Sequence, residues 1–99
     1  MTIEEATDKV KKLAEMHEGK LGAKVNFSFN EGGAIHLNDT VKPSVVSNNL
    51  DDAPCTIKVG LDSFDKMLTG DLNPMMAFMT GKMKVEGDKG VAMKLASLF

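Results

Sequence analysis

Residues 64–95 are divided into short pieces by glycine and proline, and they contain most of the methionines of the chain. The breaks fall at Gly70, Asn73-Pro74, Gly81 and Gly87, so any helix or strand between them has to be short. Six of the eight methionines lie in this segment: Met67, Met75, Met76, Met79, Met83 and Met93. Methionine is unbranched and polarizable, so it suits a space whose contents vary in shape better than branched core residues do. The segment therefore predicts short elements around a pocket for a flexible apolar ligand.

Composition favours a soluble globular domain without a basic surface. The 99 residues predict a single domain over residues 1–99. All twelve basic residues are lysines, they face fourteen acids, and the only aromatic residues of the Phe, Tyr and Trp class are five phenylalanines. Nucleic-acid binding calls for a basic patch or a row of stacking rings. We therefore expect no nucleic-acid partner.

Targeting and metal-binding signals are weak. No apolar run approaches the roughly 20 residues that span a bilayer, and the charges of Glu4 and Glu5 argue against a signal peptide, so we expect a cytoplasmic protein.

One cysteine, Cys55, excludes an internal disulfide. The two histidines stand far from it in sequence, without zinc-ligand spacing, and the acids near residues 51–65 lack the spacing of a calcium loop. We predict no metal and no cofactor.

The first two thirds of the chain predict one helix followed by four strands. Thr2 and Glu5 form a capping-box pattern ahead of a helix over residues 3–18. Apolar and polar residues then alternate in strands over residues 25–29 and 35–38, with a hairpin turn at Glu31-Gly32-Gly33. His36 falls on the polar side of its strand, so we expect it to be exposed. Residues 45–46 predict a weaker strand, and residues 55–59 a fourth.

The remaining third changes to a helical period. Asp62 is the expected cap of a helix that carries Phe64 and Leu68 and stops at Gly70. A second short helix starts at Pro74, with its apolar face formed by Met75, Phe78 and Met79. Residues 82–86 predict a fifth strand, and Asp88 caps a last helix.

This order of elements predicts an α+β fold. Four consecutive strands favour an antiparallel meander, and the fifth strand, reached through a helical crossover, is expected to pair parallel. The result is a five-stranded mixed, mainly antiparallel sheet with the helices packed on one face, which leaves room for an apolar space between the sheet and the short helices.

Several short motifs in this order resemble the sterol carrier protein type 2 family. They are Cys55-Thr56-Ile57, Phe64, Met67-Leu68-Thr69-Gly70, Asn73-Pro74, Ala77-Phe78, Gly81-Lys82, Val85, Gly87 and Ala92-Met93-Lys94-Leu95. The resemblance implies a five-stranded sheet and helices that enclose a hydrophobic tunnel. It also implies binding and transfer of fatty acids, acyl-coenzyme A, sterols and phospholipids with low selectivity.

The chain departs from familiar members of that family at three places. It ends in Ser97-Leu98-Phe99, which is not the peroxisomal tripeptide. Gly33-Ala34-Ile35-His36 stands where many members carry a tryptophan, and Thr80 stands where some carry a glutamine. A short tail leaves one end of a tunnel less covered.

We predict that twelve residues of the C-terminal half bind the lipid. They are Phe64, Leu68, Met75, Met76, Phe78, Met79, Thr80, Met83, Val91, Met93, Leu95 and Phe99. Any single methionine at helical spacing is more often core than cavity lining, and it is the cluster of six that favours a cavity. For Thr80, a contact with a ligand head group and a cap on its own helix are equally plausible.

Two classes of function are compatible with these residues. The first is a non-catalytic carrier whose partners are a long-chain or sterol-like lipid and, transiently, a membrane. The second is a non-catalytic interaction module, in which the same apolar groove binds a partner chain or a second copy in a weak homodimer. An enzyme is disfavoured, because Cys55 opens a strand without an adjacent base and cysteine is commonly a small buried hydrophobe. The lysines Lys9, Lys11 and Lys12 lie among acids, so a solvated helix face is favoured over a lipid contact.

Overall fold

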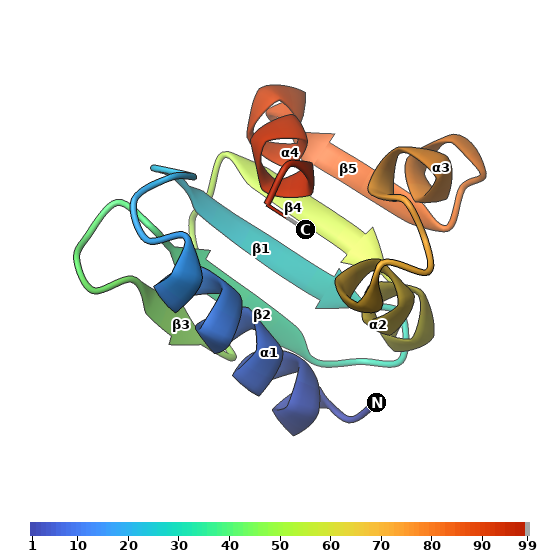
Figure 1. Ribbon diagram of the computed structural model, residues 1–99, viewed down its shortest axis with the longest axis horizontal. Helices are drawn as coiled ribbons and strands as arrows, with labels where there is room; N and C mark the ends of the chain where they lie inside the picture. The colour runs from blue at the N-terminus through green and yellow to red at the C-terminus, as the bar shows by residue number, and fades with distance from the viewer. Residues whose placement is uncertain (99) are drawn as a thin grey trace.

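A five-stranded sheet carries the helices on one of its faces (Figure 1). The computed structural model describes residues 1–98. The elements are α1 (Ile3–Met16), β1 (Lys24–Phe29), β2 (Ala34–Asn38), β3 (Val45–Ser47), β4 (Cys55–Val59), α2 (Leu61–Thr69), α3 (Pro74–Met79), β5 (Met83–Gly87) and α4 (Lys89–Ala96). The predicted α+β class is confirmed. No helix within residues 1–98 combines the length and the hydropathy that a membrane crossing requires.

The strand order is β3-β2-β1-β4-β5, which corrects the predicted topology in two places. β4 does not continue a meander beside β3, because it pairs parallel with β1. Cys55, Ile57 and Val59 of β4 are all buried, which fits the central place of this strand in the sheet, between β1 and β5. β5 pairs antiparallel with β4, not parallel, because α2 and α3 return the chain to the end of β4, where Val59 faces Met83.

The core lies between the sheet and the helices. Phe27 and Phe29 point to the helix side of β1, as their alternation predicts, and both are buried. Phe64 of α2 packs against both rings, with centroid separations of 5.2 and 5.3 Å. Tilted and edge-on ring pairs of this kind contribute about 0.5–1.5 kcal/mol each beyond the area that they bury. The contact fixes α2 over the end of β1.

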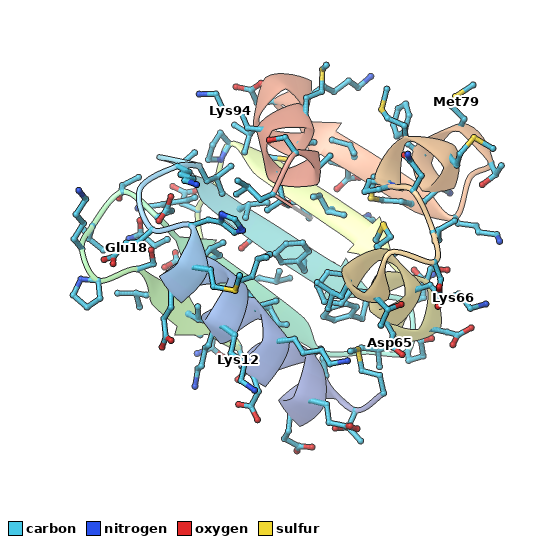
Figure 2. All side chains as sticks on the ribbon, in the orientation of Figure 1. Lys12, Glu18, Asp65, Lys66, Met79 and Lys94 are labelled. Atoms are coloured by element: carbon cyan, nitrogen blue, oxygen red, sulfur yellow. The ribbon has the colours of Figure 1, made fainter. Side chains whose placement is uncertain are left out.

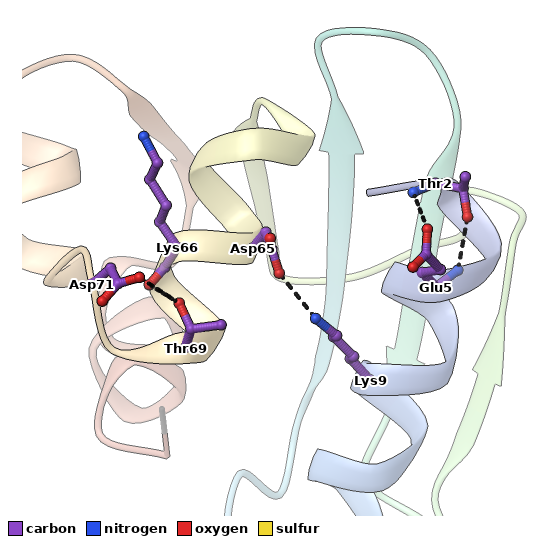
Figure 3. A network of polar contacts seen from close by, with 7 residues as sticks. All are labelled: Thr2, Glu5, Lys9, Asp65, Lys66, Thr69 and Asp71. Carbon is purple, nitrogen blue, oxygen red and sulfur yellow. Dashed lines mark hydrogen bonds and ion pairs between the residues drawn. The ribbon is translucent and has the colours of Figure 1, made fainter.

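The start of α1 confirms the predicted capping box, and an ion pair ties this helix to α2. The Thr2 amide donates to the Glu5 carboxylate at 3.0 Å, and the Glu5 amide donates to the Thr2 hydroxyl at 3.2 Å (Figure 3). Lys9 on α1 donates to Asp65 on α2 at 2.9 Å, and this hydrogen bond lowers the pKa of the Asp65 carboxyl. The helix ends at Met16, two residues before the predicted boundary, and His17 follows as its C-cap residue.

The two short helices differ in how they begin. α2 has Gly60, and not the predicted Asp62, as its N-cap residue. Its first amide, that of Leu61, donates instead to the carboxylate of Glu31 in the hairpin turn, at 3.0 Å. α3 begins as predicted, with Pro74 at its first position and the Asn73 side chain accepting from the Met75 amide at 2.8 Å.

The expectation that His36 is exposed is wrong. His36 and Asn26 lie on the sheet face away from the helices, yet both side chains are buried. They contact each other, and Asn26 also donates to the carbonyl oxygen of Asp51 at 2.7 Å. The loop that carries Asp51 therefore reaches this part of the outer face, and the alternation of polar and apolar residues along β1 and β2 carries no sign of that loop.

A candidate ligand groove between α3, β5 and α4

An apolar groove of about 140 Å³ lies where α3, β5 and α4 meet. Its lining residues are Pro74, Met75 and Phe78 from α3, Met83 and Val85 from β5, and Lys89, Ala92, Met93 and Ala96 from α4. Eight of these nine side chains are apolar, and Lys89 is the single charged one. A concave apolar site with one polar group is the usual form of a small-molecule site.

The strand and the two helices contribute to the groove in different ways. On β5, Met83 and Val85 face the groove, while Glu86 points to the other face of the sheet and pairs with Lys58 at 3.2 Å. On α4, the lining residues Ala92 and Ala96 have small side chains, which leave space in the groove. On α3, the one fully buried residue is Ala77, and the bulky side chains of this helix are all exposed.

The structure brings four of the twelve predicted lipid-binding residues into this groove: Met75, Phe78, Met83 and Met93. Phe64, Val91 and Leu95 are buried in the core, and Leu68 is half-buried against it. Met76 and Met79 lie exposed outside the groove lining. Thr80 is the C-cap residue of α3, and its hydroxyl donates to the carbonyl oxygen of Met76 at 2.7 Å. Phe99 lies outside the described residues.

Five lining residues were not predicted from the sequence: Pro74, Val85, Lys89, Ala92 and Ala96. Four positions on α4, namely 89, 92, 93 and 96, follow the spacing i, i+3, i+4 and i+7, which marks one face of a helix. That stripe is present in the sequence. Alanine and lysine are ordinary residues in any helix, however, so their chemistry does not mark the stripe as part of a site.

Large apolar side chains around the groove are unusually exposed. Relative exposures are 53% for Met75, 53% for Met76, 41% for Phe78, 75% for Met79 and 64% for Met93. The first four lie on the six-residue helix α3, and Figure 2 shows Met79 on the outer side of that helix. Contiguous apolar surface of this kind marks contact sites for ligands, membranes or other proteins.

A second hollow is larger, about 280 Å³, but it is chemically different. It lies between α1 and the segment around β3, and Lys11, Glu15 and Glu18 are among its lining residues. Charged groups in the lining suit water better than a hydrocarbon chain. We therefore take the smaller groove as the candidate site.

The one thiol of the chain, Cys55, is poorly suited to act as a nucleophile. Burial raises the pKa of the Cys55 thiol, and the nearby charge of Asp88 raises it further, against a smaller opposite effect of the Ala92 amide. A thiol held protonated in this way is a poor nucleophile. Within residues 1–98 there is also no cluster of three or more His, Cys, Asp or Glu side chains arranged to hold a metal ion.

Known proteins with similar sequence and structure share this architecture. Human sterol carrier protein 2 is 33% identical over 104 aligned residues, which cover 99% of this chain and 19% of that protein. The chain thus spans about a fifth of the length of this curated relative. The solution structure of sterol carrier protein domain 2 of Helicoverpa armigera has a TM-score of 0.76 and 27% identity, covering 94% of this chain and 84% of that one. For sterol carrier protein 2 of Yarrowia lipolytica the TM-score is 0.72 and the identity 21%, covering 97% and 84%.

The match to the family is wider than any single motif. Residues 3–99 match the SCP-2 sterol transfer family, so the match includes the helix α1 as well as the C-terminal elements that form the groove. The resemblance inferred from short motifs is therefore confirmed over nearly the whole chain. This chain belongs to the SCP-2 sterol transfer family.

Proposed function

We propose that this domain binds the hydrocarbon chain of a lipid in the groove between α3, β5 and α4 and carries the lipid without converting it. The observation that supports this most is the lining itself, which is apolar except for Lys89. The family to which the chain belongs, and the sterol carrier proteins that it resembles, point the same way.

The dimensions of the groove favour a flexible acyl chain over a rigid ring system. Ligand pockets usually measure roughly 300–1,000 Å³, and this groove, at about 140 Å³, holds only part of a long chain. The exposed side chains of Met75 and Met93 border it, and methionine adapts its shape to a neighbour easily. Burial contributes about 0.8 kcal/mol per methylene, so micromolar affinity requires about ten buried methylenes before ordering costs. This is more than a groove of about 140 Å³ encloses, so the exposed side chains of Met75 and Met93 have to supply part of the contact.

The Lys89 amine gives the ligand a direction. It lines the groove near the start of α4, where an ammonium group meets a carboxylate or phosphate more readily than an uncharged head group. Fatty acids, acyl-coenzyme A and phospholipids all carry such groups. We propose that the acyl chain lies along Met83, Val85 and Ala92 with its anionic end toward Lys89.

A titration in solution tests this proposal. A fluorescent fatty acid is added to delipidated protein without vesicles, and Met93→Asp is compared with Met16→Asp. The two methionines are similarly exposed, 64% and 73%, but only Met93 lines the groove. We expect Met93→Asp to weaken binding about tenfold or more, because a carboxylate replaces apolar surface, while Met16→Asp leaves it unchanged. Thermal melts should be alike.

Two results would overturn the proposal. One is the absence of saturable binding at every chain length tried. The other is an equal loss of fatty-acid affinity in Met93→Asp and Met16→Asp. A fluorescent sterol titrated in parallel checks the preference for an acyl chain, and stronger binding of the sterol would reverse that preference.

The carrier role also requires that no chemistry occurs. Acyl-coenzyme A hydrolysis is measured with the wild-type protein and with Cys55→Ser. We expect background rates for both, because the thiol is buried and its pKa is raised. Turnover that disappears in the variant would instead make this domain an enzyme.

A further inference from the structure

Two exposed methionines are not explained by the proposed ligand. We call Met75, Met76, Phe78, Met79 and Met93 together the methionine face. Met75, Phe78 and Met93 line the groove, so a bound chain covers part of them. Met76 and Met79 do not line it, and they are 53% and 75% exposed. A ligand in the groove leaves their apolar surface in water, and exposed apolar surface of this kind favours contact with a partner larger than one lipid.

Charge is distributed unevenly between this region and the rest of the chain. Residues 72–99 contain four lysines and two acids, whereas residues 1–71 contain eight lysines and twelve acids. From residue 72 to residue 85 the only charged residues are Lys82 and Lys84. The region that carries the methionine face is thus cationic within a chain of net negative charge.

The two acids of this region each have a partner. Glu86 pairs with Lys58 on the far face of the sheet at 3.2 Å. Asp88 caps α4 by accepting from the Gly90 amide at 2.8 Å. Lys82 is exposed in the turn that follows α3, and Lys89 is exposed and lines the groove together with Met75, Phe78 and Met93. The methionine face therefore has a lysine next to it in the chain, Lys82, and another beside it in the groove, Lys89.

We propose that the methionine face docks on the surface of an anionic lipid bilayer, with the groove mouth turned toward the lipid. Lysines near a bilayer are attracted to anionic phospholipids, and apolar side chains at the centre of the contact enter the headgroup region. Protein interfaces, in contrast, are enriched in arginine and depleted in lysine, and this chain has no arginine. A membrane is therefore the better partner for this surface than another protein.

The proposal rests on the proposed function for its purpose, because a lipid that leaves a bilayer through this mouth does not have to cross water. Docking itself is independent of a bound ligand. It also differs from a contact through α1. Residues 1–20 contain four lysines among five acids, and Met16 is the one large apolar residue of α1 that is well exposed.

Vesicle flotation tests the docking surface on the full chain. The vesicles consist of phosphatidylcholine alone or of phosphatidylcholine mixed with phosphatidylserine. We expect binding to the mixed vesicles that falls with added salt. Met79→Asp and Lys82→Glu should each lower the partition coefficient about tenfold, one by removing apolar contact and the other by reversing a charge. The α1 variants Met16→Asp and Lys12→Glu are matched controls and should bind like the wild type.

The outcomes separate docking from ligand binding. Lys82→Glu should bind vesicles about tenfold more weakly than the wild type while binding the fatty acid in solution equally well. If the wild-type protein binds the fatty acid in solution but binds no vesicles, the docking proposal is overturned and the carrier role stands. If the wild-type protein binds vesicles but shows no saturable binding of the fatty acid in solution, docking is supported and the carrier role is overturned.

Two further results would overturn docking through the methionine face. One is loss of vesicle binding in the α1 variants but not in the others. The second is a wild-type dimer, seen by sedimentation velocity, that Met79→Asp dissociates while vesicle binding stays unchanged. Thermal melts of all four variants check that each is folded, and the charge reversal at Lys82 keeps the test decisive if Met79→Asp is unstable.

Discussion

Asn26 on β1 and His36 on β2 stand directly opposite each other, with Asn26 Oδ1 2.6 Å from His36 Nδ1. The amide nitrogen of Asn26 donates to the carbonyl oxygen of Asp51 at 2.7 Å, so its oxygen is left to accept from the protonated Nδ1 of His36. One side chain thus joins two strands and the loop that precedes β4. Each of these groups is satisfied by the others.

Replacing Asn26 by leucine should therefore be costly. The variant keeps the branched shape of the side chain but leaves His36 Nδ1 and the Asp51 carbonyl without their partner, and we expect a loss of about 2–3 kcal/mol in the free energy of unfolding. Urea denaturation measures it. Ser28→Ala, two residues along on the same face of β1, is the control and should stay within about 0.5 kcal/mol. Equal losses in both variants would mean that the network contributes nothing.

This network also shows what alternation can and cannot predict. The pattern along β1 places Phe27 on the helix side correctly, because period two decides which side chains share a face. It says nothing about what covers the other face. The partner of Asn26 is 25 residues away in sequence, in an irregular loop, and only the three-dimensional path of the chain reveals that contact. For this reason a polar position was wrongly expected to be exposed at His36.

Asp39 is a buried carboxylate that should make the stability of the domain depend on pH. Burial by itself raises the pKa of this carboxyl, but hydrogen bonds from the Ser44 hydroxyl and from the amides of Gly19, Gly22 and Leu21 outweigh it and hold the pKa below its usual value. A carboxyl whose pKa is lower in the folded state stabilises the fold above its unfolded pKa, about 3.9. That contribution is lost as the pH falls through the folded value.

We therefore expect Asp39→Asn to lose about 2 kcal/mol at neutral pH and to flatten the fall in unfolding free energy below about pH 4. Chemical denaturation at a series of pH values measures both effects. Asp52→Asn, at an exposed position in the loop before β4, is the control. If the unfolding free energy of Asp39→Asn falls with decreasing pH as steeply as that of the wild type, this carboxyl is not the group responsible.

Gly87 ends β5 at a place where a side chain has no room. Its φ is 91°, and a Cβ there would overlap the carbonyl oxygen of Pro54, which also accepts from the Asp88 amide at 2.7 Å. Gly70 has almost the same φ, 86°, but nothing lies within 4 Å of a Cβ. The two positions share the backbone cost of alanine and differ only in the steric overlap.

We expect Gly70→Ala to cost about 1 kcal/mol and Gly87→Ala about 2–4 kcal/mol, the difference being the forced shift of β5. Since β5 carries Met83 and Val85, the second variant should also weaken fatty-acid binding. Thermal melts and the solution titration are read together. Equal destabilisation by both alanines would show that β5 shifts away from Pro54 without a measurable loss of unfolding free energy.

The groove itself was only partly predictable, and the reason lies in α3. Its six residues, Pro74–Met79, contain no polar side chain, so no polar face marks which side meets water. The structure turns Ala77 inward and leaves Met79 outside, the reverse of what side-chain size suggests. The place of the groove further depends on the antiparallel pairing of β5 with β4, which decides where Met83 lies relative to α4.

Lys89 is the lining residue whose effect on ligand choice can be isolated. If its amine meets the anionic end of the ligand, Lys89→Gln should weaken binding of a fatty acid about threefold to fivefold, the range of an exposed ion pair. Binding of the corresponding methyl ester should not change, because the ester carries no charge. Competition against a fluorescent fatty acid measures both ligands. Lys94→Gln is the control, since Lys94 lies on the same helix outside the groove lining, on the side turned away from α3 (Figure 2). A parallel loss for acid and ester in Lys89→Gln would assign this lysine a packing role, and equal effects at Lys94 would reduce both to general charge.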